Sequence, residues 1–131
     1  MTTFPITTLY VLPLTVIFLA LWMNVTMTRS KLSQSIGDGG NIDLHERIRK
    51  HGNFVEWVPM VLLLMILAEA RGAGPLWLHA AGGLLTAGRV LHPFGLKANN
   101  PVHPLRIAGN SGALLATAIL LIALVRSVLS I

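Results

Sequence analysis

The stretch RKHGNFVEWVP, Arg49 to Pro59, joins a basic segment to an apolar one. Its carboxylate, Glu56, lies within an apolar run that extends from Phe54 to Ala68. A charged group in hydrocarbon is costly unless it is paired or faces a polar cavity, so an ionisable residue in such a run is a candidate functional residue. We therefore expect a membrane helix with one polar face around Glu56.

The composition of the whole chain agrees with a membrane protein. Of its 131 residues, 53% are hydrophobic and 11% are charged, whereas soluble domains carry about 25% charged residues. The absence of cysteine excludes disulfides, thiolate nucleophiles and cysteine metal sites. Lys and Arg outnumber Asp and Glu by 10 to 5, which in a membrane protein indicates orientation rather than binding to nucleic acid.

Four apolar runs are each near the ~20 residues that cross a bilayer as a helix. They cover about residues 4–27, 43–70, 75–95 and 104–130. The spacing Asp43-x-x-Glu46 predicts a capping box at the start of the second run. The first and fourth runs are apolar around their full circumference, which disfavours a soluble bundle. The first run has no preceding Lys or Arg and no small-residue cleavage site, so we expect a membrane helix rather than a signal peptide.

The sequence thus predicts an all-α, integral membrane four-helix bundle with a single domain over residues 1–131. Four crossings place the first and third loops on one side, and the basic residues are distributed unequally between the two sides. Arg71 and Arg126 fall on the side of the termini, against seven on the other: Arg29, Lys31, Arg47, Arg49, Lys50, Lys97 and Arg106. The excess predicts cytoplasmic first and third loops, with both termini on the opposite side.

The second helix carries its polar residues on one face. At 100° per residue, Arg49, Asn53 and Glu56 project within about 60° of one another. A guanidinium, an amide and a carboxylate together suit a small zwitterionic or peptide-like ligand. The alternative is that Arg49 neutralises Glu56 without any ligand. His51 lies about 200° from Arg49 on this helix and should face elsewhere.

The other helices add basic residues at the same depth. Arg89 and His92 lie one turn apart near the end of the third helix, Arg106 begins the fourth, and Arg29 ends the first. Because each helix brings an arginine to one layer, the sequence predicts a positively charged funnel that attracts anions. The alternative is that Arg89 and His92 extend to the membrane surface and bind no ligand. The five histidines lack metal-ligand spacing, so no metal site is expected.

Small residues at helical spacing predict close contacts between helices in lipid. These motifs are Gly83-x-x-x-Ala87, Gly109-x-x-x-Ala113 and Gly112-x-x-x-Ala116. So small a protomer would shield its arginines poorly by itself, and we therefore expect it to form an oligomer.

The residues also resemble a known family. Arg49-x-His51-x-Asn53-x-x-Glu56-x-x-Pro59, followed by Gly88-Arg89-x-x-His92, is similar to the MAPEG family, the membrane-associated proteins in eicosanoid and glutathione metabolism. The resemblance covers nearly the whole chain and is strongest to compact bacterial members. It implies a homotrimer in a bacterial inner membrane, with glutathione as co-substrate between subunits near the cytoplasmic side. Membrane lipid and a lipophilic small molecule are the other implied partners.

The resemblance also implies roles for individual residues. Arg106 resembles the arginine that stabilises the glutathione thiolate, and Glu56 the residue that holds the γ-glutamyl amine. The implied glutathione-binding residues are Arg29, Arg49, His51, Asn53, Glu56, Arg89 and His92. The charges agree, since glutathione carries two carboxylates and one ammonium group. A guanidinium near its thiol, whose ordinary pKa is about 8.5, would lower that pKa and produce the nucleophile.

The expected activity is that of a glutathione transferase or peroxidase acting on lipophilic electrophiles or hydroperoxides. Two alternatives are a non-catalytic lipid-binding or scaffold protein of the same family, and a small multidrug exporter. The arginine layer disfavours an exporter, because it would repel cationic substrates. Ile107 and Leu96 stand where some catalytic members carry a serine and a tyrosine, so the resemblance favours glutathione binding over any named synthase activity.

Overall fold

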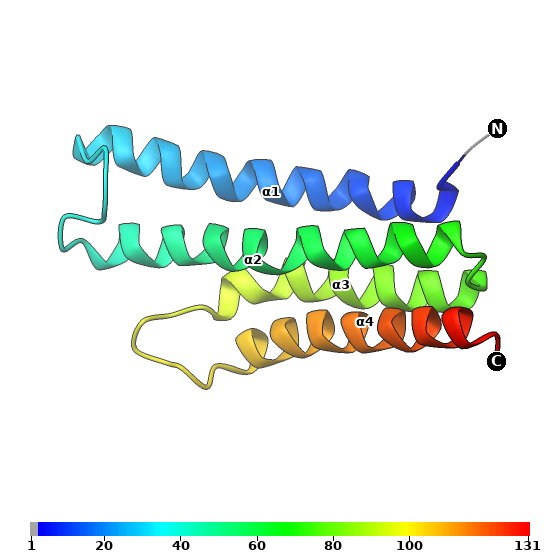
Figure 1. Ribbon diagram of the computed structural model, residues 1–131. Coiled ribbons are helices and arrows are strands. Elements are labelled where there is room, and N and C mark those ends of the chain that lie inside the picture. The colour runs from blue at the N-terminus through cyan, green and yellow to red at the C-terminus, as the bar shows by residue number, and fades with distance from the viewer. Residues whose placement is uncertain (1–2) are drawn as a thin grey trace.

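The chain forms four antiparallel helices. In the computed structural model, which describes residues 3–131, these are α1 (Pro5–Leu32), α2 (Ile42–Ala70), α3 (Pro75–Gly95) and α4 (Pro104–Leu129). The α1–α2 and α3–α4 loops lie at one end of the bundle, here called the loop end (Figure 1). The α2–α3 turn, the start of α1 and the end of α4 lie at the other, the terminal end. The all-α prediction is confirmed.

Within residues 3–131, three helices, α1, α2 and α4, are long and apolar enough to cross a membrane. The sequence analysis expected α3 to be a fourth span of the same kind. With 21 residues interrupted by His79, Arg89 and His92, α3 does not reach the apolar content of the other three. Two of these polar side chains are among the most buried of the protein, since Arg89 and His92 are 1% and 2% exposed, whereas His79 is exposed.

Two local predictions were wrong. Helix α1 continues beyond the apolar run that ends near Met27, and beyond Arg29, which was expected to end it. It extends to Leu32 and ends where Ser33 adopts a left-handed conformation with φ of 52°. Helix α2 is capped by Asn41, whose side chain accepts a hydrogen bond from the Leu44 N–H at 3.0 Å. The carboxylates of the expected capping box bind other groups, so one Asn cap replaces it.

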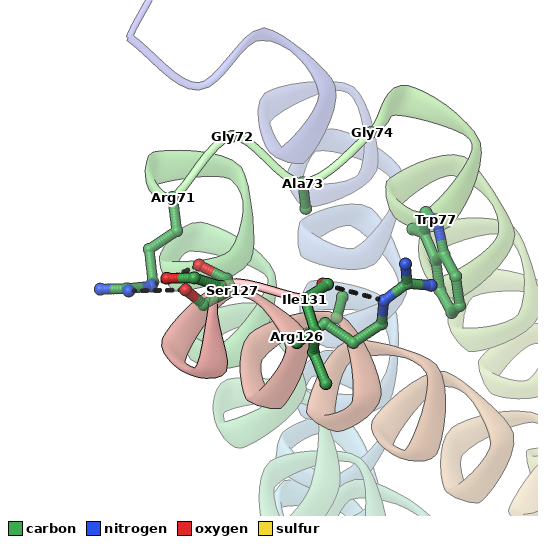
Figure 2. Close-up of a pocket in the computed structure, with 10 residues that line it drawn as sticks. Arg71, Gly72, Ala73, Gly74, Trp77, Arg126, Ser127 and Ile131 are labelled. Carbon is green, nitrogen blue, oxygen red and sulfur yellow. Dashed lines mark hydrogen bonds between the residues drawn. The ribbon is translucent and has the colours of Figure 1, made fainter.

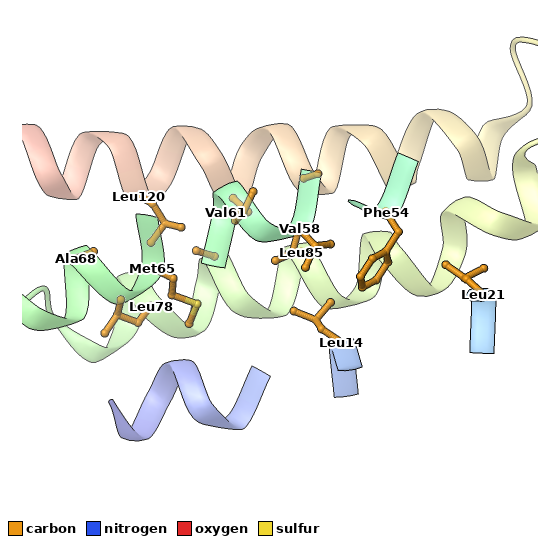
Figure 3. Close-up of a cluster of buried hydrophobic side chains, with 13 residues drawn as sticks. Leu14, Leu21, Phe54, Val58, Val61, Met65, Ala68, Leu78, Leu85 and Leu120 are labelled. Atoms are coloured by element: carbon orange, nitrogen blue, oxygen red, sulfur yellow. The ribbon is translucent and has the colours of Figure 1, made fainter. Parts of the chain in front are cut away.

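The core lies along the shared axis of the helices (Figure 3). On α2 the buried apolar residues alternate spacings of four and three, as expected for a helix packed along one stripe. These residues are Phe54, Val58, Val61, Met65 and Ala68. Helix α1 contributes only two buried apolar residues, Leu14 and Leu21, one per heptad. It is therefore a peripheral helix, with α2, α3 and α4 forming the central group.

Glycines let α3 and α4 pack at short distance. A Cβ on Gly109 would lie 2.6 Å from the His92 Cβ and 2.8 Å from the Gly88 carbonyl oxygen. A Cβ on Gly112 would lie 2.7 Å from the Leu84 carbonyl oxygen. This confirms the close contacts expected at Gly109 and Gly112, whereas a Cβ on Gly83 would meet nothing within 4 Å. The short distance between backbones brings side chains of α3 within reach of α4 carbonyls.

Glu69 connects peripheral α1 to the central group at the terminal end. Its carboxylate accepts hydrogen bonds from the backbone N–H groups of Ile6 and Thr7, both at 2.9 Å, and from the Thr7 hydroxyl at 2.6 Å. The first N–H groups of a helix have no partner within it, and a carboxylate at that position also complements the helix dipole. Glu69 therefore caps α1 from a different helix.

Candidate functional site

A buried arginine joins the three central helices near the loop end. Arg89 of α3 donates from Nη1 to the Asn53 Oδ1 on α2 at 2.6 Å. It also donates from Nη2 to the Gly109 carbonyl oxygen on α4 at 2.7 Å. The glycine contact between α3 and α4 makes the second bond possible. Arg89 is 1% exposed, which contradicts the alternative that it extends to the membrane surface.

Buried nitrogen atoms in the same region lack partners. Within residues 3–131, the Arg89 Nε and the His92 Nε2 have no hydrogen-bond acceptor or donor. Buried polar groups are almost always satisfied, so such atoms need an explanation, such as a bound water or ligand. His92 also lines the cavity described next.

A cavity of about 350 Å³ opens beside these groups at the loop end; it is called the loop-end cavity. It lies between the first turns of α2, the end of α3, the α3–α4 loop and the start of α4. Its lining residues are Ile42, His45, Glu46, Arg49, Asn53, His92, Leu96, Lys97, Ala98 and Arg106. The volume lies within the range of small-molecule sites, about 300–1,000 Å³.

Positive charge dominates the loop-end cavity. Arg49, Lys97 and Arg106 supply cations, and Glu46 supplies the one carboxylate among the lining residues. That carboxylate is already engaged, because it accepts the Ala98 N–H at 2.9 Å and lies 3.7 Å from the Lys97 Nζ. Glu46 thus fixes the α3–α4 loop against α2, and an anion entering the cavity would meet two guanidinium groups.

One more ionic contact positions a histidine of this cavity. In the α1–α2 loop, Asp38 accepts a hydrogen bond from the Gly40 N–H at 2.9 Å and lies 2.5 Å from the His45 Nδ1. The Gly40 N–H and, after it, the His45 ring hold the pKa of Asp38 below its ordinary value. The loop therefore holds His45 at the edge of the cavity.

Arg49 and Glu56 form the pair that the ligand-free alternative predicted. Arg49 Nη1 and Nη2 donate to the two carboxylate oxygens of Glu56 at 3.1 and 3.3 Å. The two side chains are 46% and 53% exposed, and Glu56 does not line the loop-end cavity. Both side chains are therefore open to a ligand or to a second protein surface.

The remaining sequence-predicted residues lie elsewhere in the protomer. His51 packs against Phe18 of α1, with ring centroids 5.4 Å apart, as its angle on the helix indicated. Arg29 donates to the carbonyl oxygens of Gln34 and Gly37 at 3.1 and 2.7 Å and so shapes the α1–α2 loop. Their roles in glutathione binding stay predictions.

The structure therefore brings together four predicted residues, Arg49, Asn53, His92 and Arg106, with Arg89 behind Asn53. Sequence reasoning did not include His45 or Lys97 in the site. Both are placed by loop contacts that helical periodicity does not report, although Lys97 lies in a polar loop that was recognised as such.

Comparisons with known proteins concern the family of the whole chain. The model of the MAPEG family matches residues 6–126. Inner membrane protein YecN of Escherichia coli strain K12 is 39% identical over 72 residues, and the protein of that name from E. coli O6:H1 aligns equally. The aligned part is 55% of this chain and 55% of each relative, so the match spans about half of their length. No solved structure matches the chain significantly. The chain is a membrane protein and belongs to the MAPEG family.

Proposed function

We propose that the protein binds glutathione in the loop-end cavity and acts as a glutathione transferase or peroxidase on lipophilic electrophiles or hydroperoxides. The observation that carries the proposal is the cavity itself, about 350 Å³, in which Arg49, Asn53 and Arg106 lie around one space. Two helices supply these residues, so their positions depend on packing of the bundle rather than on a mobile loop.

The chemistry of the cavity complements that of glutathione. Each of the two carboxylates of the tripeptide can accept paired hydrogen bonds from a guanidinium fork. Asn53 already accepts from Arg89 through Oδ1, so its amide NH₂ remains a donor for the ligand. Arg89 thus positions Asn53.

The proposed catalytic residue is Arg106. It lies in the first turn of α4 and lines the cavity, and within residues 3–131 its guanidinium makes no hydrogen bond or ion pair. A guanidinium beside the glutathione thiol favours the thiolate, because opposite charge stabilises the ionised form. The thiolate sulfur then attacks an electrophilic carbon and displaces its leaving group. With a hydroperoxide the thiolate attacks the terminal oxygen, the O–O bond breaks, and the alkoxide leaves and takes a proton from water to become an alcohol. A second glutathione then converts the sulfenic acid to a disulfide and water.

A homotrimer would complete the site. Glu56 lies 14 residues into the 29-residue helix α2, roughly 21 Å from its start. A half-exposed Arg49–Glu56 pair at this depth needs cover, because charged groups in contact with lipid are costly. A neighbouring subunit would supply this cover and would let Glu56 hold the γ-glutamyl ammonium group between subunits. The basic residues at the loop end favour a cytoplasmic position for the site.

Calorimetry with glutathione on the detergent-purified protein tests the proposal. We expect saturable binding by the parent protein and about tenfold weaker binding by Arg49→Gln, which loses a charge-assisted pair. Arg126→Gln, at the other end of the bundle, is the matched control and should bind as the parent does. No saturable binding by the parent would refute the proposal.

One observation favours the lipid-binding alternative. A groove of about 450 Å³ between α1 and α3 is lined mainly by apolar residues, with Asn24, Lys50 and Arg89 also contributing. Such a groove suits an acyl chain with a polar head. A panel of lipophilic electrophiles and hydroperoxides separates the two functions: turnover supports the enzyme, whereas glutathione binding without turnover of any member supports a non-catalytic protein.

A further inference from the structure

A second cavity, of about 450 Å³, lies at the terminal end of the bundle, where the α2–α3 turn meets the end of α4; it is called the terminal-end cavity. Figure 2 shows Arg71 and Arg126 on two sides of it, with Trp77 beside Arg126. The lining residues are Arg71, Gly72, Ala73, Gly74, Trp77, Ala123, Arg126, Ser127, Ser130 and Ile131. None of the residues assigned to glutathione takes part.

Both guanidinium groups are held in place by the protein. Arg71 donates from Nε to the Ser127 Oγ at 2.7 Å and from Nη2 to the Ser127 carbonyl oxygen at 3.3 Å. Arg126 donates from Nε to the Ile131 carbonyl oxygen at 3.4 Å, and its guanidinium carbon lies 6.0 Å from the Trp77 ring centroid. A guanidinium carries five N–H donors. Most of the ten donors therefore remain available to a ligand.

No acidic side chain neutralises these arginines. The terminal-end cavity has none among its lining residues. Of the five Asp and Glu residues in the chain, only Glu69 lies at this end of the bundle. Its carboxylate is occupied by Ile6 and Thr7 of α1. The side chains around the terminal-end cavity thus carry two positive charges and no negative charge, which makes them complementary to an anion.

The position of the terminal-end cavity identifies the source of that anion. Helices α2 and α4, both apolar enough to cross a membrane, end here. Trp77 has the side chain that is enriched at the membrane–water boundary. Leu76 and Leu129, next to lining residues, are 80% and 60% exposed. The cavity thus lies at the level of lipid headgroups, and exposed apolar side chains adjoin it.

We propose that the terminal-end cavity binds the phosphodiester headgroup of an anionic phospholipid. Arg71 and Arg126 donate to the phosphate oxygens, because a guanidinium fork matches the geometry of phosphate. The Ser127 hydroxyl accepts from Arg71 and still has its own hydrogen to donate to a headgroup oxygen. The site is separate from the loop-end cavity and does not depend on the function proposed there.

Fluorescence of Trp77 tests this site. In a protein with Trp22→Phe and Trp57→Phe, Trp77 is the remaining tryptophan of the three in the chain. This protein is placed in mixed micelles and titrated with phosphatidylglycerol or with phosphatidylcholine. The acyl chains of both lipids are brominated near the headgroup, so that a bound lipid quenches the fluorescence of Trp77. Circular dichroism checks that the helix content is unchanged. We expect saturable quenching by phosphatidylglycerol at a concentration about tenfold below that needed for phosphatidylcholine. Equal half-saturation by the two lipids overturns the proposal.

Variants locate the binding residues. Arg71→Gln and Arg126→Gln should each raise the half-saturating phosphatidylglycerol concentration several-fold, and together abolish the preference. Lys31→Gln, which removes a charge at the loop end, should leave it unchanged. If the glutamine pair fails to fold, Arg71→Lys with Arg126→Lys keeps both charges and should still prefer phosphatidylglycerol. Inorganic phosphate at equal concentration should compete weakly; phosphate binding without any lipid preference overturns the lipid assignment.

Discussion

Removing the partner of a buried charge is the sharpest test of the architecture near the loop end. Asn53→Leu is nearly isosteric but deletes the oxygen that accepts Arg89 Nη1 at 2.6 Å. The guanidinium then retains one acceptor within residues 3–131, the Gly109 carbonyl oxygen at 2.7 Å. Its Nε has none already. Since Arg89 is 1% exposed, solvent cannot replace the lost partner unless the helices separate.

The expected cost follows from three magnitudes. A hydrogen bond to a charged group contributes about 1.5–3 kcal/mol, and removing one partner of a buried ion pair costs about 3–5 kcal/mol. Hydrogen bonds between membrane helices average only about 0.6 kcal/mol, because the unfolded state in the membrane also finds partners. Arg89 keeps one acceptor, so we expect a decrease of about 2 kcal/mol in the free energy of unfolding, or roughly thirtyfold in the equilibrium constant.

Equilibrium unfolding in mixed micelles with increasing dodecyl sulfate, followed by far-ultraviolet circular dichroism, measures this cost. Asn99→Leu, in the exposed part of the α3–α4 loop, is the matched control and should change stability by less than about 0.5 kcal/mol. Adding Arg89→Met to Asn53→Leu should restore part of the loss, because no buried charge remains unpaired. If Asn53→Leu costs no more than Asn99→Leu, the Arg89–Asn53 bond does not stabilise the bundle and the reasoning is wrong.

Three other predictions concern catalysis and packing. Arg106→Ala should bind glutathione within a few fold of the parent but lose the ultraviolet absorbance of the bound thiolate near neutral pH; an unchanged thiolate signal would remove Arg106 from its proposed role. Gly109→Ala should lower the free energy of unfolding by about 1–3 kcal/mol in the same unfolding assay, because the added Cβ would clash with α3. Gly83→Ala, whose Cβ would meet nothing within 4 Å, is the control and should be neutral or stabilising. Equal effects of the two substitutions would contradict the close α3–α4 contact. Glu69→Gln should weaken the cap of α1 by about 1–2 kcal/mol and speed amide exchange in its first turn relative to α4; unaltered exchange there would show that the cap is not needed.

The boundaries of the helices follow closely from local signals. The prolines at residues 75 and 104 begin α3 and α4 as expected, since proline fits the first helical position. Helix α1 extends beyond its apolar run and past Arg29 to Leu32, because Arg and Lys are good helix formers outside the membrane. The predicted capping box of α2 does not form, because Asp43 accepts from Arg47 one turn along the same helix and Glu46 accepts from Ala98 in the α3–α4 loop. Local patterns therefore define the elements, whereas a cap such as that of Glu69 on α1 depends on contacts between helices.

The candidate site, too, could be predicted only in part from the sequence. Angular spacing on α2 placed Arg49, Asn53 and Glu56 on one face and His51 on another. Arg49 and Asn53 line one cavity and His51 lies away from it, but Glu56 does not line that cavity. Spacing says nothing of how deep a side chain of another helix lies, so the burial of Arg89 could not be predicted. That burial depends on the glycines that bring α3 and α4 together, and the small-residue motifs only indicated that some close contact would exist.

Arg89 shows why a helix in this bundle would retain a costly buried cation. A hydrophobic residue of similar size at that position would give a simpler core, since buried charges seldom add net stability. The guanidinium, however, fixes the orientation of Asn53 by taking its oxygen, and the amide hydrogens that remain can only donate. The guanidinium groups of Arg49 and Arg106, which line the same cavity, are also hydrogen-bond donors. The three side chains therefore favour carboxylate oxygens as ligands and disfavour cations. In the proposed function, the buried charge on α3 would therefore contribute to selectivity for an anionic ligand even though Asn53 separates it from the cavity.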